Sequence, residues 1–198
     1  MSTRNALVLS AAIAALAAAP VPAVAQGTGT DATSITVTAG SLGFGTNFAA
    51  ANFPNTALSG LAQTVSTSVG TWSVNDARGS LLGWNVKVGA TRFTDQNGTP
   101  GDTTDDKTLP LSSLTLTAPT AVAAGGQSSL LAPVVQPLTT ALDNGTADVS
   151  AAVAALSTGQ GLWNFTQGAS HLSLVLPATA STGTYASTIT TTLSSGVL

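Results

Sequence analysis

The sequence predicts an all-β protein: a single β-sandwich or barrel-like domain with Gly/Pro-rich loops, preceded by a helical signal peptide. Three observations support this fold class. Hydrophobic side chains recur at every second residue in many short stretches, which is typical of half-buried strands. Glycine, proline and asparagine separate these stretches, and the 198-residue chain contains 20 Gly and 9 Pro. No stretches of helical period alternate with the strands, which favours an antiparallel sandwich or barrel.

The first 25 residues have the pattern of an export signal. Arg4 supplies a positive charge, residues 6–19 form an apolar helical core, and Pro20 and Pro22 end it. Small residues at 23–25 suit a signal peptidase, and the apolar run is shorter than the roughly 20 residues that span a bilayer. We therefore expect cleavage after Ala25, a mature domain over 26–198 that does not span the membrane, and a secreted, cell-surface or cell-wall location.

The composition excludes several classes of function. The chain has five Lys and Arg, eight Asp and no Glu, a formal net charge of −3, and no cysteine. A mildly acidic, charge-poor surface has no electrostatic attraction for nucleic acid. Without cysteine, the protein has no disulfides and no thiol catalysis, so a hydrophobic core must stabilise it. The single histidine, His171, is out of phase with Leu172 and is expected on the solvent face; we predict no enzyme and no cofactor.

The clearest strand pattern lies in residues 71–93. Trp72 and Val74 share one face of a first strand, and the even-numbered residues from 82 to 90, Trp84 among them, share one face of a second. Residues 75–80 between them are rich in turn formers. The pattern predicts a long β-hairpin with one apolar and one solvated face. Because aromatic residues in phase with valines usually lie in the core, both tryptophans are expected mainly there.

Other stretches predict the rest of the sheet structure. Residues 42–55 read as an ordered loop whose phenylalanines reach the core, and a parity change at Gly70 suggests a β-bulge. Residues 130–135 could pair at a sheet edge, since the surrounding prolines exclude a central place. Residues 149–156 could form a helix or a strand, and the all-β surroundings favour a strand. Strands are expected over 35–39, 61–74, 109–117, 149–156, 172–176 and 185–193, with a turn at 143–146.

The acidic residues gather in the loop 94–108. Its oxygen-bearing side chains, separated by Gly and Thr, are of the kind that calcium binds. The loop has no glutamate for a bidentate closing ligand, and its spacing does not fit the EF-hand pattern. A solvated loop joining two strands is therefore favoured, and no metal is assigned. The residues concerned are Asp95, Asn97, Asp102, Asp105 and Asp106.

Two motifs carry a resemblance to a known family. Residues 74–79 (VNDARG), followed by 83–86 (GWNV), form a D-x-R-G turn leading into G-W-x-(aliphatic). Residues 185–193 (YASTITTTL) have a Tyr, three intervening residues, an aliphatic residue and a Thr, but Thr191 stands where a W-x-L tryptophan would follow. Residues 159–163 and 174–177 add a Gly-rich aromatic turn and a strand ending in proline. The ordered set resembles the WxL domain of exported Gram-positive surface proteins, with a degenerate C-terminal motif.

That resemblance implies non-covalent attachment to peptidoglycan or another cell-wall glycan, often beside a membrane-anchored companion protein. Sugar rings pack on aromatic faces, and their hydroxyls pair with amides, carboxylates and guanidinium groups. Asp76 and Arg78 could instead simply pair with each other. The candidate ligand-binding residues are Trp84, Trp163 and Tyr185 as platforms, and Asn75, Asp76 and Arg78 as polar contacts.

A second hypothesis also fits the residues. A charge-poor, Thr-rich sheet surface has low self-repulsion. Such a surface suits a self-assembling structural subunit of a surface coat, filament or adhesive complex.

Overall fold

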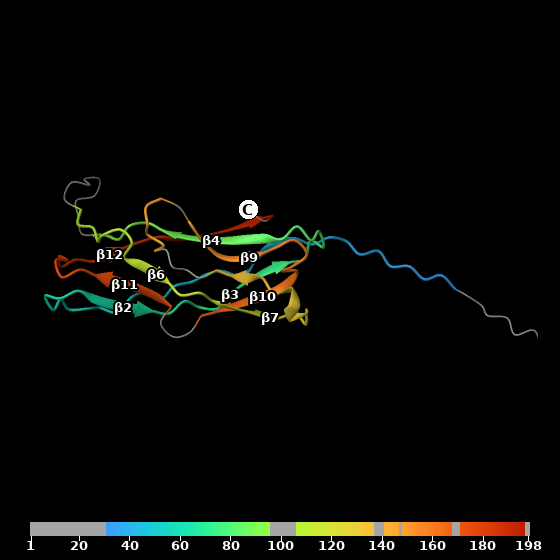
Figure 1. Ribbon diagram of the computed structural model, residues 1–198, viewed down its shortest axis with the longest axis horizontal. Helices are drawn as coiled ribbons and strands as arrows, with labels where there is room; N and C mark the ends of the chain where they lie inside the picture. The colour runs from blue at the N-terminus through green and yellow to red at the C-terminus, as the bar shows by residue number, and fades with distance from the viewer. Residues whose placement is uncertain (1–30, 96–105, 137–140, 147, 168–170, 197–198) are drawn as a thin grey trace, which may run out of the picture. The chain divides into compact units, whose positions relative to one another are not determined.

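The computed structural model describes residues 31–95, 106–136, 141–146, 148–167 and 171–196 (Figure 1). The signal-peptide prediction and most of the acidic loop, including Asn97, Asp102 and Asp105, lie outside these residues. The chain divides into two units, residues 1–36 and 37–198, and every described strand belongs to the second. No helix in the described ranges is long and apolar enough to cross a membrane.

The described part of the second unit is built from β-strands, with one short 3₁₀ turn, η1 (Ser129–Leu131). The strands are β1 (Leu42–Thr46), β2 (Gln63–Thr67), β3 (Trp72–Asp76), β4 (Trp84–Ala90), β5 (Thr94–Asp95), β6 (Leu114–Leu116), β7 (Thr120–Ala123), β8 (Val134–Val135), β9 (Val149–Ala154), β10 (Gly161–Thr166), β11 (Leu172–Leu176), β12 (Tyr185–Ala186) and β13 (Ile189–Ser195).

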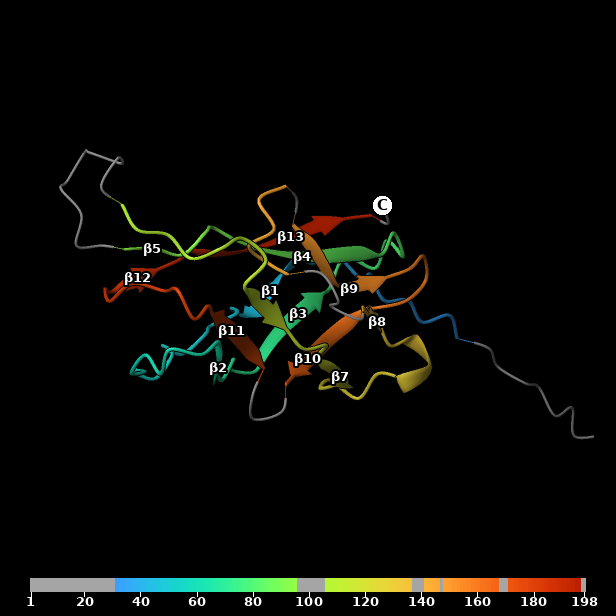
Figure 2. The ribbon, with the colours of Figure 1, turned by 60° about the vertical axis from the view of Figure 1, so that its left-hand side comes forward.

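The strands form four antiparallel sheets that make up two layers. One sheet has the order β1-β3-β10-β7, and the three-stranded sheet β2-β11-β6 prolongs it, because β2 leads directly into β3 and β10 into β11. The other layer has the order β13-β4-β9-β8, prolonged by the pair β12-β5. Figure 2 shows β13, β4 and β9 above β3, β10 and β7. The prediction of an all-β, sandwich-like fold is confirmed.

The predicted hairpin over 71–93 is wrong, although both of its strands exist. β3 pairs with β1 and β10, whereas β4 pairs with β13 and β9. The connection over 77–83 therefore carries the chain from one layer to the other. Two strands with apolar faces can bury them either side by side or face to face, and the alternation of side chains is the same in both cases.

The apolar faces of β3 and β4 meet in the core between the layers. Trp72 and Trp84 are 1% and 0% exposed, which confirms the expectation that they lie in the core. Phe165 of β10 joins them: its ring stacks on Trp72 at a centroid distance of 4.0 Å and meets Trp84 edge-on at 6.1 Å. Offset stacking and edge-to-face contact are the favoured geometries of aromatic pairs. Phe165 is thus the ring that links the two layers.

Several other predicted strands are confirmed. β6 buries Leu114 and Leu116, and β11 runs over 172–176 up to Pro177. Residues 149–154 form a strand rather than a helix, and β8 pairs with it at the edge of its sheet. Residues 143–146 form a turn.

The structure differs from the sequence prediction before β3. Residues 35–39 form no strand; Ile35 is 88% exposed and Val37 84%. β1 lies instead in the stretch expected to be a loop, although Phe44, Phe48 and Phe53 do pack against the core as expected. Apolar alternation alone does not create a strand without a neighbouring ladder, because the backbone groups need partners.

The parity change at Gly70 reflects a strand break rather than a β-bulge. β2 ends at Thr67 and β3 begins at Trp72. Between them, the Gly70 N–H donates to the Ala49 carbonyl oxygen at 2.8 Å. Two strands in successive sheets therefore account for the two phases of alternation.

His171 lies in the core rather than on the solvent face. It is 3% exposed, and its Nδ1 accepts a hydrogen bond from the Val69 N–H at 3.3 Å. Burial lowers the pKa of His171 from its ordinary value of 6.5, because the charged imidazolium loses its hydration. The histidine immediately precedes β11 and is buried as a neutral ring.

Because Phe165 links both tryptophans, we expect Phe165→Ala to lower the free energy of unfolding by about 3–5 kcal/mol, as is usual for truncation of a buried aromatic ring. Urea unfolding followed by circular dichroism measures this. Val122→Ala on the neighbouring strand β7 is the control, since Val122 is 48% exposed and should change stability by less than about 0.5 kcal/mol. Equal effects of the two substitutions would contradict the assigned role.

Candidate functional site

The first motif contains a partly buried ion pair. Arg78 Nε lies 2.8 Å from Asp76 Oδ1, and Arg78 Nη2 lies 2.8 Å from Asp76 Oδ2, so the contact is bidentate. The Arg78 N–H also donates to Asp76 Oδ1 at 3.2 Å. Asp76 is 3% exposed. Planar guanidinium and carboxylate groups match in this geometry, which gives direction as well as energy.

The same guanidinium joins the two motif regions. Arg78 Nη2 donates to the Gly83 carbonyl oxygen at 2.8 Å, and Nη1 donates to Ser195 Oγ. Gly83 precedes β4 and Ser195 is the last residue of β13, so one side chain ties the layer crossing to the neighbouring strand. The hydrogen bond and charge of Arg78 lower the pKa of Asp76, and Asp76 in turn raises the pKa of Arg78. Both groups are therefore charged at neutral pH.

The backbone is unusual at this end of the domain, which we call the crossing end (residues 77–83, 155–160 and Ser195). Leu81 and Ser157 have φ values of 60° and 64°, and the Ser157 N–H donates to the Leu81 carbonyl oxygen at 2.9 Å. A Cβ at Gly83 would lie 2.2 Å from the Ala154 carbonyl oxygen, so only glycine fits there. Left-handed conformations of residues other than glycine cluster at functional sites, where the surrounding contacts hold them.

The strained loops hold apolar side chains in solvent. Leu81 is 48% exposed, Leu82 51% and Leu156 64%. Below them, the buried Trp84 Nε1 donates to the Gly159 carbonyl oxygen at 3.0 Å and so fixes the loop that carries Leu156. The sequence pattern placed Leu82 on the buried face of β4, but this strand begins only at Trp84. Exposed leucines on loops that are held in place by hydrogen bonds are suited to contact a partner.

The structure brings together three of the six predicted site residues. Asn75, Asp76 and Arg78 lie at the end of β3, with Asn75 exposed and Asp76 engaged by Arg78. Trp84 and Trp163 are buried, at 0% and 1% exposure, and present no free ring face.

Tyr185 lies away from the crossing end. It pairs with Asp95 in the β12-β5 ladder. Ten residues separate Tyr185 from Ser195 at the crossing end, which is roughly 30 Å at about 3.3 Å per residue of strand. Its hydroxyl donates to the Ser181 carbonyl oxygen at 3.0 Å. Burial is the main cause that raises the pKa of Tyr185.

Four residues that the proposed contact uses at the crossing end were not predicted as site residues: Leu81, Leu82, Leu156 and Ser195. The glycines at 79 and 83 mark a tight connection in the sequence. They do not indicate that Leu81 takes a left-handed conformation, because that follows from its hydrogen bond with residue 157 in a distant part of the chain.

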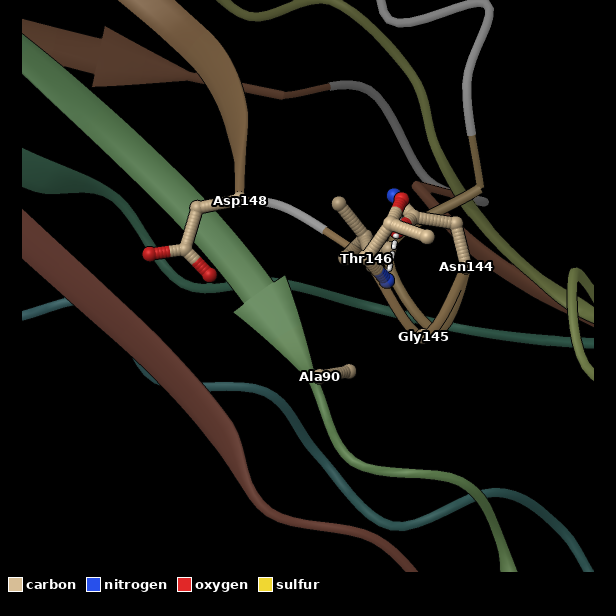
Figure 3. Close-up of a pocket in the computed structure, with 6 residues that line it drawn as sticks. Ala90, Asn144, Gly145, Thr146 and Asp148 are labelled. Carbon is tan, nitrogen blue, oxygen red and sulfur yellow. Dashed lines mark hydrogen bonds between the residues drawn. The ribbon is translucent and has the colours of Figure 1, made fainter.

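A pocket of about 280 Å³ lies at the other end of β4 (Figure 3). The turn that lines this pocket forms hydrogen bonds within itself: Asn144 Oδ1 accepts from the Thr146 N–H and from the Thr146 hydroxyl, both at 2.8 Å. The Asp148 carboxylate points away from this turn, over Gly89. The described residues contain no group of three or more His, Cys, Asp or Glu side chains that could hold a metal ion. The pocket therefore offers little to a ligand.

The Asp76–Arg78 pair generates a stability prediction. We expect Asp76→Asn to lower the free energy of unfolding by about 1.5–3 kcal/mol at pH 7, because it removes charge-assisted hydrogen bonds. The pKa of Asp76 is lower in the folded than in the unfolded protein, so the pair stabilises fully above about pH 4 and loses its effect as pH falls through the folded-state pKa. Urea unfolding at pH 7 and at pH 3 measures both effects.

Asp31→Asn is the matched control, because Asp31 is exposed and undergoes the same chemical change. A stability difference between Asp76→Asn and the unmodified protein that stays constant down to pH 3 would show that the carboxylate charge is not the stabilising element.

Comparison with known proteins identifies the family. The family described as "WxL domain surface cell wall-binding" matches residues 18–196. No curated protein and no solved structure matches the chain. The matched residues include both motif regions that Arg78 joins, from Asp76 to Ser195. With nearly its whole length matched, the chain belongs to the WxL family of cell-wall-binding surface proteins.

Proposed function

We propose that this protein attaches non-covalently to peptidoglycan through its crossing end. Membership of a cell-wall-binding family supports binding to the wall. We choose this surface because the Arg78 side chain joins the two motif regions there. It bonds Asp76 and Gly83 of one region and Ser195 of the other. A binding surface built from both regions requires them to meet, and they meet there.

The chemistry of the crossing end suits the wall polymer. Peptidoglycan combines sugar rings, which have apolar C–H faces, with short peptides that carry methyl groups and amides. Leu81, Leu82 and Leu156 offer exposed apolar contacts, and Asn75 offers an amide that can both donate and accept hydrogen bonds. Trp84 is buried below this surface and positions the loop that contains Gly159 through its hydrogen bond to the Gly159 carbonyl oxygen.

The degenerate position of the C-terminal motif, Thr191, lies outside the crossing end. Thr191 lies in the middle of β13, opposite Val88 of β4, and is half-buried. It is four residues from Ser195 and belongs to the flank of the core. Threonine in place of tryptophan therefore alters packing along β13, while the crossing end keeps its contacts.

Export is part of the same proposal. The leader Met1–Ala25 directs the chain out of the cell and is removed, and the mature domain of residues 26–198 acts by adhesion rather than catalysis. The surface family to which the chain belongs supports this location. We expect the first residue of the secreted protein to be Gln26, and N-terminal sequencing of the exported protein measures this. A protein that still begins at Met1 would contradict the proposed processing.

Co-sedimentation with purified peptidoglycan tests the binding surface. We expect the unmodified protein to pellet with peptidoglycan, without a companion protein, and not with an inert insoluble polysaccharide. We expect Leu82→Asn to weaken binding about five- to tenfold, because a half-exposed leucine adds roughly 1–1.4 kcal/mol when it is fully buried.

The matched control is Leu111→Asn. Leu111 is 46% exposed, like Leu82, but lies beside Gly145 at the other end of the domain. The same loss of binding in both variants would exclude the crossing end as the contact surface. No pelleting of the unmodified protein would overturn peptidoglycan as the ligand.

A further inference from the structure

Strand β13 has a long edge to which no described strand is hydrogen-bonded, although β1 of the other layer lies close to β13. It lies at the end of the sheet β13-β4-β9-β8 and pairs with β4 over all seven of its residues, without a break in register. No other described strand pairs with its second edge. The remaining edge strands of the described sheets are shorter, and β1 is interrupted by an irregularity between Phe44 and Thr46. β13 is therefore the longest regular edge in the described part of the fold.

The hydrogen bonds at the two ends of the ladder show which backbone groups face outward. The Thr91 N–H donates to the Thr188 carbonyl oxygen, and the Gly196 N–H donates to the Gly83 carbonyl oxygen. Hydrogen-bonded pairs alternate along an antiparallel ladder, so the even-numbered residues of β13 bond to β4. The residues that turn their N–H and C=O groups away from β4 are Ile189, Thr191, Leu193 and Ser195.

β13 lacks the features that normally protect an edge. Its sequence, ITTTLSS, contains no charged residue and no proline. Natural edge strands avoid pairing with other chains through lysines, prolines, bulges or short length. A seven-residue edge without any of these is a template for another strand.

We propose that this edge pairs with the same edge of a second copy of the chain. The strand is self-complementary in one register: an antiparallel partner centred on Thr192 sets Ile189 opposite Ser195 and Thr191 opposite Leu193 of the other copy. These are the residues whose backbone groups face outward, so every one of the resulting four residue pairs exchanges two hydrogen bonds. Such an isologous contact closes as a dimer with twofold symmetry.

The side chains favour a second copy as the occupant. On the exposed face, Thr192 meets Thr192 of the other copy, and Thr190 meets Ser194; hydroxyl pairs of this kind stabilise neighbouring strands. The absence of charge means that two identical strands do not repel each other. The N-acetyl amides of a glycan lie on separate sugar rings and do not reproduce the alternating N–H and C=O groups of a second strand. Leu81 and Leu82 of the proposed wall contact lie outside β13. The dimer surface therefore shares only Ser195 with the crossing end, and the exposed leucines of the proposed wall contact lie outside it.

A pair of lysine variants tests this register. In Thr192→Lys, the two introduced ammonium groups face each other across the twofold axis, where Cα atoms of a non-hydrogen-bonded pair are about 4.5 Å apart. In Thr190→Lys, the same substitution on the same exposed face leaves the two charges four residues apart along the strand. That is about 14 Å, beyond the screening length of about 8 Å at physiological salt.

Solution mass, measured by sedimentation equilibrium of the mature protein at rising concentration, gives the result. We expect the unmodified protein and Thr190→Lys to dimerise, and Thr192→Lys to dimerise at least about fivefold more weakly. Mixing Thr192→Lys with Thr192→Asp should restore the dimer, because opposite charges then meet at the axis. A monomer at all concentrations, or a Thr192→Lys dimer as strong as that of Thr190→Lys, would overturn the proposal.

Discussion

The first change of layer along the chain, from β3 to β4, is held by one guanidinium. Between Asp76 and Gly83 the chain leaves the sheet of β3 and enters that of β4, so both apolar faces can enclose the same core. A connection of this kind must satisfy its turned backbone groups without a ladder. Arg78 satisfies one of these groups, the Gly83 carbonyl oxygen, and at the same time bonds the Asp76 carboxylate and the Ser195 hydroxyl. Together with the hydrogen bond from the Gly196 N–H to the Gly83 carbonyl oxygen, that side chain anchors the crossing to the end of β13.

A core closed in this way explains why the chain needs no disulfide and little charge. Trp72, Phe165 and Trp84 form a continuous aromatic contact through both layers. Large rings bury much area at a modest cost in side-chain entropy. The surface can then consist of hydroxyls and amides, as the 7% of charged residues indicates. Such a surface neither attracts nor repels other molecules over long distances, so recognition depends on direct contact.

The sequence predicted the fold class and most strands, but not which strands are neighbours. Alternation over 71–93 identified β3 and β4 correctly, because period two depends only on which face is buried. It could not separate a hairpin from a crossing, since both bury the same side chains. The same limit applies to the site. Asp76 and Arg78 were close enough in sequence for their pairing to be foreseen, whereas the contacts with Ser195 and between Ser157 and Leu81 join residues more than 70 positions apart.

The buried tryptophans change how the motif itself is understood. Trp84 is fully enclosed, and its one polar atom bonds the Gly159 carbonyl oxygen. A side chain in that position cannot stack on a sugar without leaving the core, which costs several kcal/mol for a ring of this size. In the proposed function, the part of Trp84 is therefore to hold the loop that presents Leu156. Thr191, which occupies the other motif position, is opposite Val88 and likewise acts on the framework. These motif residues set the geometry, and in the proposed function it is their exposed neighbours that contact the wall.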